Sequence, residues 1–199
     1  MRFCFLFFLF CLQAVEGAYR WPTSEWPSAL PTQVGADSAE LERFLAYVFP
    51  DNLDWNSRDG RRTEALVIIK DGYLIYERYE KNYGPAQRHL AWSMTKMVLN
   101  ALVGISERKG LLKLEDPIQK YLPAGKVPKE IQQIRVKDLL AWSSGIKWNE
   151  TYEYNPLQSS VIEMLYSQPN IPAFVWSRPL SFVPGSHFNY SSGDSNLLM

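Results

Sequence analysis

Residues 89–110 read HLAWSMTKMVLNALVGISERKG, in which Ser93 is followed three positions later by Lys96. A serine and a lysine at this spacing can be a nucleophile and its proton acceptor, or a helix cap beside a surface lysine. The spacing alone does not decide, because Ser106 and Ser144 are each followed by a lysine at the same distance. Roughly one such pair is expected by chance in a chain of this composition. The surrounding pattern has to discriminate between them.

The same stretch has the pattern of an amphipathic helix. Apolar residues recur at a spacing near 3.6 after Trp92, and Gly110 follows two basic residues, which predicts a C-terminal end. The apolar stripe consists of Met94, Met97, Val98, Ala101, Leu102 and Ile105. Ser93 lies at or just inside the predicted N-terminus, where a capping serine would prefer Glu or Gln three positions later. Lys96 stands there instead, although the helix macrodipole disfavours a cation in the first turn, and a residue placed against local preference is more often functional.

Acid–base chemistry between a serine and a lysine on one helical turn would explain why Lys96 stands at this position. One turn brings Ser93 and Lys96 to the same face, within hydrogen-bonding reach. A lysine in a partly desolvated pocket can lose its proton near neutral pH and help deprotonate a serine hydroxyl. The N–H groups at a helix N-terminus can also stabilise an oxyanion. Ser106 lies at the solvated C-terminal end of the same helix and Ser144 precedes Gly145 in a loop, so the pattern favours Ser93 and Lys96.

The remaining chain predicts a mixed fold. Two runs with strong strand preference, EALVIIK and YLIYERY, flank Asp71-Gly72, a dipeptide suited to a tight hairpin turn. A helix is expected from about Asp37 to Pro50. Further helical segments are expected within residues 110–125, 134–148 (ending at 143–145) and 156–169, the last with Leu157, Val161, Met164 and Leu165 on its buried face. We therefore expect an α+β fold, in which an antiparallel sheet is flanked by helices and a helical region is inserted after its first strands.

Composition and the first residues limit the partners and the compartment. Lys and Arg number 21 and Asp and Glu number 21, so no basic excess points to nucleic acid. Residues 1–17, MRFCFLFFLFCLQAVEG, combine an early arginine, a short apolar run and small residues, which predicts a secretory signal peptide cleaved after Gly17. A buried N-terminal helix or an uncleaved anchor is the alternative. Because both cysteines lie in this segment, the mature protein would have no disulfide, and we expect it to be secreted or periplasmic without a membrane anchor. Residues 18–35 are expected to form an extended arm.

Four stretches carry a resemblance to a known family. They are, in order, WSMTKMVLNALVG, KGLLKLEDPIQKYLP, IRVKDLLAWSSGI and FVPGSHFNYSSGDSNLL. Together they resemble the penicillin-recognising serine hydrolases, in the branch related to class C β-lactamases that includes esterases and 6-aminohexanoate-dimer hydrolases, over about residues 64–199. The resemblance implies that residues 36–199 form the N-terminal part of a β-lactamase/transpeptidase-like domain, which cleaves an amide or ester bond through an acyl-enzyme. It implies that Ser93 is the nucleophile, Lys96 its activating partner and Tyr190 a residue that shuttles protons.

The sequence departs from that family's pattern at two points. Ser192 stands where the family's Tyr-x-Asn element has Asn, which is closer to esterases and 6-aminohexanoate-dimer hydrolases than to strict β-lactamases. Ser192 is therefore a further candidate for binding the substrate or Lys96. The family's third element, a triplet with Lys or His that ends in Gly on a sheet-edge strand, is absent from the printed sequence, so we expect the sheet to be incomplete. We also expect the longer gene product to be the hydrolase and this chain alone to be inactive or nearly so.

Other chemistries find little support in the sequence. With two histidines, no H-E-x-x-H and no G-x-S-x-G, neither a metal centre nor a Ser-His-Asp hydrolase is expected, and no cofactor is implied. The expected partner is a small amide or ester, and the oligomeric state stays open. Two hypotheses remain. The first is an exported acyl-enzyme hydrolase, and the second is a truncated or non-catalytic relative that at most binds a peptide-like or cell-wall ligand.

Overall fold

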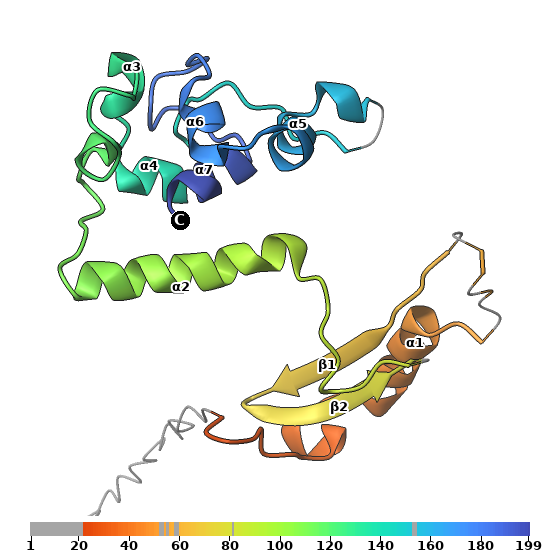
Figure 1. Cartoon of the computed structure of the whole chain (residues 1–199). Helices are drawn as coiled ribbons and strands as arrows, with labels where there is room; N and C mark the ends of the chain where they lie inside the picture. Colours follow the sequence, from red (N-terminus) through yellow and green to blue (C-terminus); the bar gives the residue numbers. More distant parts are fainter. Residues whose placement is uncertain (1–21, 52–53, 55, 58–59, 81, 153–154) are drawn as a thin grey trace, which may run out of the picture. The chain divides into compact units, whose positions relative to one another are not determined.

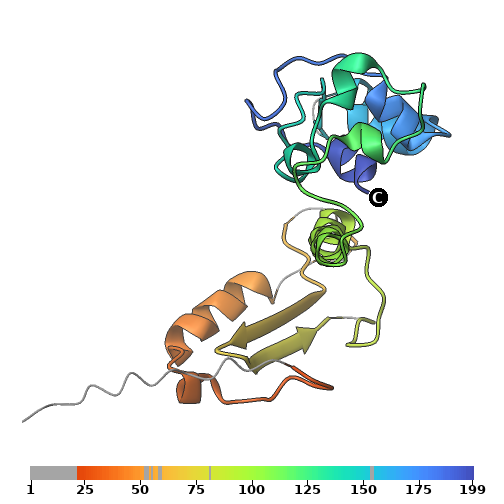
Figure 2. The same cartoon turned by 90° about the vertical axis from the view of Figure 1, so that its left-hand side faces the viewer.

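The computed structural model describes residues 22–51, 54, 56–57, 60–80, 82–152 and 155–199. The predicted signal peptide and the first residues of the predicted arm lie outside the described residues. The chain divides into two compact units, one ending at His89 and the other beginning at Leu90 (Figures 1 and 2). In the part of the chain that the structure describes, no helix is both long enough and apolar enough to cross a membrane.

The first unit is built on a two-stranded antiparallel hairpin, β1 (Ala65–Lys70) and β2 (Tyr73–Tyr79), which confirms the predicted turn. Asp71 and Gly72 have φ angles of 52° and 79°, the left-handed pair that a tight hairpin requires. The 3₁₀ turn η1 (Pro31–Val34) and helix α1 (Ser38–Val48) precede the hairpin. Before η1, residues 27–29 run beside β2, where the Leu74 N–H donates to the Pro27 carbonyl over 2.8 Å. The Asp37 carboxylate caps α1 by accepting from two backbone N–H groups.

The second unit is helical and begins with the predicted long helix. The 3₁₀ turn η2 (Trp92–Met94) leads directly into α2 (Thr95–Arg108), and Gly110 ends it with a φ of 71°. The elements that follow are η3 (Ile118–Lys120), α3 (Lys129–Gln132), α4 (Val136–Leu140), η4 (Pro156–Gln158), α5 (Ser160–Ser167), α6 (Ile171–Trp176) and α7 (Ser192–Leu197). With one small antiparallel sheet among the described residues and helices elsewhere, the fold is mixed as expected.

Three details of the helical region differ from the prediction. Helix α4 ends at Leu140 rather than at residues 143–145, because Trp142 adopts a left-handed φ of 50° that interrupts the helix. In α5 only Val161 and Met164 of the predicted face are buried. Leu165 is 45% exposed, and Leu157, which lies in η4 and not in the helix, is 91% exposed. The apolar stripe of α2 is also largely exposed, and the buried residue of this helix is Val103, which lies outside the stripe.

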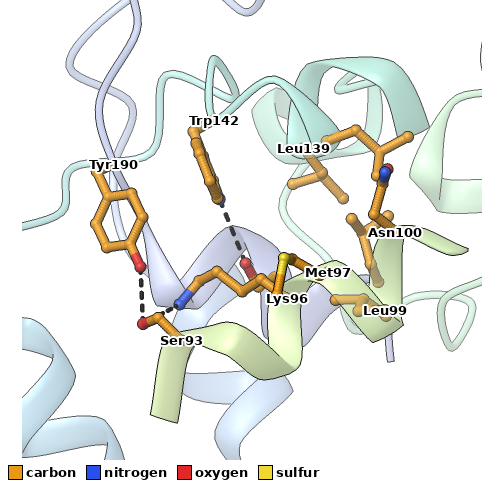
Figure 3. A pocket seen from close by; sticks show the side chains of 11 residues that line it. Ser93, Lys96, Met97, Leu99, Asn100, Leu139, Trp142 and Tyr190 are labelled. Atoms are coloured by element: carbon orange, nitrogen blue, oxygen red, sulfur yellow. Dashed lines mark hydrogen bonds between the residues drawn. The ribbon is translucent and has the colours of Figure 1, made fainter. Parts of the chain in front are cut away.

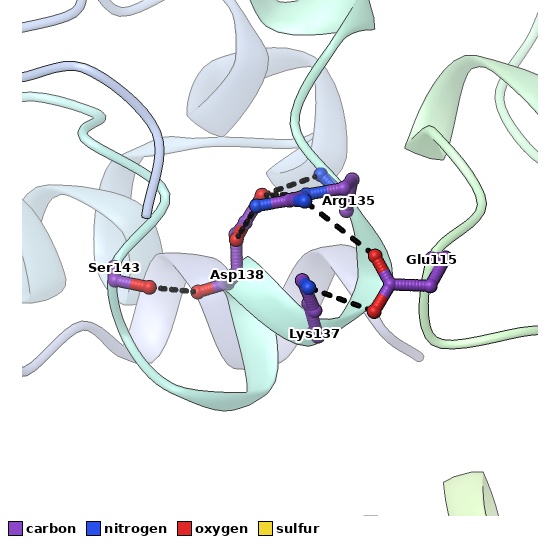
Figure 4. A network of polar contacts seen from close by, with 5 residues as sticks. All are labelled: Glu115, Arg135, Lys137, Asp138 and Ser143. Carbon is purple, nitrogen blue, oxygen red and sulfur yellow. Dashed lines mark hydrogen bonds and ion pairs between the residues drawn. The ribbon is translucent and has the colours of Figure 1, made fainter. Parts of the chain in front are cut away.

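The hydrophobic core of the second unit is formed by residues of η3 to α6 and of the loops between them. Its members are Ile118, Val127, Ile131, Ile134, Leu139, Ile146, Trp148, Val161, Met164, Val175 and Trp176. Polar contacts around the start of α4 are drawn in Figure 4. Arg135 donates through Nε and Nη2 to both carboxylate oxygens of the buried Asp138, at 3.0 and 3.1 Å, while Lys137 donates to Glu115 at 2.7 Å. These charge-assisted bonds hold the start of the helix that leads to Trp142.

A buried carboxyl group ties α7 to the loop after α4. Asp194 is 1% exposed, and its Oδ1 accepts from Ser144 Oγ at 2.8 Å and from Ser191 Oγ at 3.1 Å. Its second oxygen, Oδ2, has no hydrogen-bond partner among the described residues. Burial is the main reason that the pKa of Asp194 is raised to about 7, and the two serine hydroxyls oppose this rise in pKa. The native state therefore favours the protonated form of Asp194 more strongly than the unfolded chain does.

This raised pKa predicts that the second unit loses stability as the pH rises. The stabilisation is fully present below about pH 4, where an unfolded Asp is protonated, and is lost as the pH rises through the folded pKa of about 7. Asp194→Asn should lack this loss, so the free energy of unfolding of the parent protein should fall relative to the variant by on the order of 3 kcal/mol between pH 4 and pH 8. Urea denaturation followed by tryptophan fluorescence measures this difference. Glu130→Gln, which removes an exposed carboxylate in α3, is the control, and equal pH dependence of the parent and Asp194→Asn would contradict the assignment.

Candidate active site

Ser93 lies at the point where the chain enters α2. It is the middle residue of η2, and the preceding residue, Trp92, has a φ of 43°. A bulky residue in this left-handed region is strained, and such strain is concentrated at functional sites. The first turn of α2 has no acidic residue, and its N-cap, Met94, makes no side-chain hydrogen bond. No acidic side chain in this turn therefore neutralises the positive end of the helix dipole beside Ser93.

The three residues that the sequence predicted as catalytic meet at the Ser93 hydroxyl (Figure 3). Lys96 Nζ lies 3.1 Å from Ser93 Oγ, and the Tyr190 hydroxyl donates to the same oxygen at 2.8 Å. Lys96 Nζ also lies 4.9 Å from the centroid of the Tyr190 ring, within the range of a cation–π contact. Ser93 and Tyr190 are 97 positions apart in the sequence, so the fold and not local spacing brings them together.

Ser192 joins this group, together with a residue that sequence reasoning missed. Lys96 Nζ donates to Ser192 Oγ at 2.9 Å, and that hydroxyl donates to Glu150 Oε1 at 2.6 Å. Glu150 also accepts from the Ser192 backbone N–H at 2.7 Å, from Trp148 Nε1 at 2.8 Å and from the Tyr152 hydroxyl at 2.7 Å. Burial and the hydrogen bond to Glu150 raise the pKa of Tyr152. No local motif marks Glu150, and its only signal in the sequence is an acidic residue between a tryptophan and a tyrosine.

The segment that carries Tyr190 is held from several sides. The Trp142 ring meets the Tyr190 ring edge-on, with centroids 4.8 Å apart and an interplanar angle of 60°. The neighbouring Asn189 donates its backbone N–H to the Trp142 carbonyl at 2.8 Å and its side-chain amide to the Trp148 carbonyl at 3.1 Å. A Cβ on Gly193 would lie 2.7 Å from the Trp148 ring, so α7 can only pack this closely with glycine there. Tyr190 is thus positioned by packing as well as by hydrogen bonds.

Two hollows in the second unit border the Ser93 and Lys96 side chains. One has a volume of about 360 Å³ and is lined by Ser93, Lys96, Met97, Leu99, Asn100, Leu139, Leu140, Trp142, Tyr190, Ser195 and Leu198. The other, of about 270 Å³, includes Trp92, Ser93, Lys96, Tyr152, Val161, Met164, Leu165 and Ser192. Both linings are mostly apolar, and Lys96 is the charged side chain in each. Such hollows suit the aliphatic part of a small ligand.

The rival residues of the sequence have other roles in the structure. Ser144 is buried, donates to Asp194 and accepts from the Ile146 N–H at 3.2 Å. Its hydroxyl therefore stabilises the loop and, among the described residues, makes no hydrogen bond to a lysine. His187 stacks on the Phe182 ring at 4.0 Å, and His89 Nε2 lies 2.6 Å from Glu64 Oε2 in the first unit. Neither histidine lines the two hollows, and the described residues contain no cluster of ligands suited to a metal ion.

Comparisons with known proteins place the chain in a family. The Beta-lactamase family pattern matches residues 36–199. The chain is 27% identical over 92 residues to the 6-aminohexanoate-dimer hydrolase of Paenarthrobacter ureafaciens, which covers 45% of this chain and 23% of that protein. Among solved structures it is similar to the "Putative 6-aminohexanoate-dimer hydrolase from Bacillus anthracis", with a TM-score of 0.63, 19% identity, and coverage of 88% of this chain and 47% of that chain.

This chain is similar to only a part of each of the two relatives. The aligned part of this chain spans less than half the length of either relative. The structural likeness shows a fold of the β-lactamase/transpeptidase type, and the family match includes the stretches around Ser93 and Tyr190. The chain belongs to the beta-lactamase family and is related to 6-aminohexanoate-dimer hydrolases.

Proposed function

We propose that this protein is an exported serine hydrolase that cleaves an amide or ester bond through an acyl-enzyme on Ser93. The observation that carries the proposal is the convergence of Lys96 Nζ and the Tyr190 hydroxyl on Ser93 Oγ, at 3.1 and 2.8 Å. Membership of the beta-lactamase family supports the class of reaction. Export rests on the signal-like pattern of residues 1–17.

Each of the three residues has a step in this reaction. A neutral Lys96 takes the hydroxyl proton of Ser93 while Oγ forms a bond to the carbonyl carbon of the substrate. When the tetrahedral intermediate collapses, the carbon–nitrogen or carbon–oxygen bond breaks and Tyr190 passes a proton to the leaving group. Water then attacks the ester on Ser93 with the same groups relaying protons, which releases the acid and restores the serine.

The surroundings of Ser93 support a substrate with an aliphatic part. The two hollows beside the serine are lined mostly by apolar side chains. The names of both relatives specify a dimer of 6-aminohexanoate, and we include such dimers among the candidate substrates. This proposal replaces the expectation that this chain alone is inactive or nearly so, and it does so because Lys96 Nζ and the Tyr190 hydroxyl lie within hydrogen-bond distance of Ser93 Oγ.

An uncharged alkyl fluorophosphonate should label Ser93 rapidly and with a stoichiometry near one per chain, because the reagent requires only an activated serine. Ser93→Ala should abolish labelling. Ser106→Ala is the matched control, since it removes the serine of the other Ser-x-x-Lys pair on the same helix and should leave the rate unchanged. Intact-mass spectrometry measures the adduct. Labelling that persists in Ser93→Ala, or none in the parent chain, would overturn the mechanism and favour a non-catalytic relative.

Tyr190→Phe should slow labelling of Ser93 by about 10²-fold, which is typical of the loss of one proton-transfer group, because the ring and its contact with Trp142 remain while the hydroxyl is lost. Tyr166→Phe removes the hydroxyl of an exposed tyrosine in α5 and should label at the parental rate. The second-order rate constant of labelling measures both. A rate for Tyr190→Phe equal to that of Tyr166→Phe would exclude Tyr190 from proton transfer.

A further inference from the structure

Glu150 stands one hydrogen bond beyond the proposed catalytic residues and has no step in the reaction above. Its Oε1 accepts from Ser192 Oγ at 2.6 Å, and the same hydroxyl accepts from Lys96 Nζ at 2.9 Å. The three groups therefore form a chain that runs from a carboxylate through one hydroxyl to the ammonium or amine of Lys96. Its far end is Ser93, which Lys96 also contacts.

The carboxylate of Glu150 is held in a single orientation. Oε1 accepts from the hydroxyls of Ser192 and Tyr152, while Oε2 accepts from the Ser192 backbone N–H and from Trp148 Nε1. None of these four donors carries a charge. Along the hydrogen-bond chain, the positive partner of Glu150 is therefore Lys96, and Ser192 separates the two.

Besides Glu150, four titratable groups lie in or beside this hydrogen-bond chain and bear on its charge. Lys96 comes from α2, Tyr152 from the loop before η4, Tyr190 from the segment before α7, and Asp194 from α7 itself. The Oδ1 atom of Asp194 accepts hydrogen bonds from Ser144 and Ser191 and not from Lys96. The two tyrosines are neutral when protonated. Glu150 is the carboxylate that the hydrogen bonds connect to Lys96.

We propose that Glu150 is a positioning residue that acts through Ser192 to direct Lys96 at Ser93 and to stabilise the positive charge that Lys96 gains when it takes the serine proton. This inference rests on the proposed function. The proton moves from Ser93 Oγ to Lys96 Nζ and stays there until it replaces the proton that Tyr190 gives to the leaving group. Glu150 remains a carboxylate throughout, and no proton crosses Ser192.

The same arrangement explains why a serine can replace the family's asparagine at position 192. A hydroxyl that accepts from Lys96 needs a separate acceptor for its own hydrogen, because a buried donor left unpaired is unfavourable. Glu150 supplies that acceptor at 2.6 Å. Ser192, which is 8% exposed, therefore works as a link between two charged groups more than as a surface that meets the substrate.

The test is the rate of fluorophosphonate labelling of Ser93 measured from pH 5 to pH 10. In Glu150→Gln the maximal rate should fall about tenfold, because the positive charge formed on Lys96 loses its partner. The acid limb of the profile should also move about one pH unit lower, because without the negative charge a neutral lysine is available at lower pH. Glu150→Asp, which keeps the charge, should recover part of both changes. A purely structural role of Glu150 would lower the rate without moving the limb.

Two further variants keep the test decisive. Ser192→Ala interrupts the link while Glu150 stays in place, so it should move the acid limb in the same direction, and combining it with Glu150→Gln should add little to either change. Glu163→Gln, at an exposed position of α5, should match the parent. Asp194 is present in every variant, so its titration contributes equally. Labelled Ser93 with unchanged profiles would overturn the role of Glu150 alone, whereas no labelling of the parent would overturn the proposed function and this inference with it.

Discussion

The site depends on polar contacts that join α2 to the segment 189–197. Helix α2 buries Val103 but leaves most of its apolar stripe exposed, so its place in the second unit is not secured by a large apolar interface. The contacts of Lys96 with Ser192 and of Ser93 with Tyr190 instead connect it to a segment nearly one hundred positions later. The residues that would perform the reaction are thus also the residues that hold the two parts of the site together. Changes at these positions therefore affect geometry and chemistry at once.

The far side of the site is more firmly supported. Helix α7 is anchored by the buried Asp194 and by the close approach of Gly193 to the Trp148 ring. Trp148 donates in turn to Glu150, so the tryptophan both packs beneath α7 and orients the carboxylate that reaches Ser192. The helix is six residues long and has little stability of its own. Its position, and that of Tyr190 before it, follow from these tertiary contacts.

The sequence was informative where local chemistry dominates. Asp71-Gly72 predicted the hairpin because two left-handed residues in succession are needed there, and the stripe after Trp92 predicted α2 because periodicity reports helical geometry directly. The prediction of Ser93, Lys96 and Tyr190 as one group came from the resemblance, and the structure brings them together. Glu150 was not predicted, since its relation to Lys96 exists only after loop and helix have packed. The exposure of Leu157 and Leu165 was also missed, because periodicity gives the face of a helix but not what covers it.

The Ser192 hydroxyl has a single hydrogen, and this fixes the direction of the hydrogen bonds that run from Lys96 to Glu150. Because that hydrogen points to Glu150, the oxygen can only accept from Lys96, so the lysine must turn one of its own hydrogens toward Ser192. When Lys96 is neutral, its nitrogen has one lone pair, and a hydrogen is already committed on the Ser192 side. The lone pair therefore cannot be used on the Ser192 side and is available to Ser93, which lies 3.1 Å away. A carboxylate that never touches the nucleophile thus keeps the lone pair of the amine from facing Ser192.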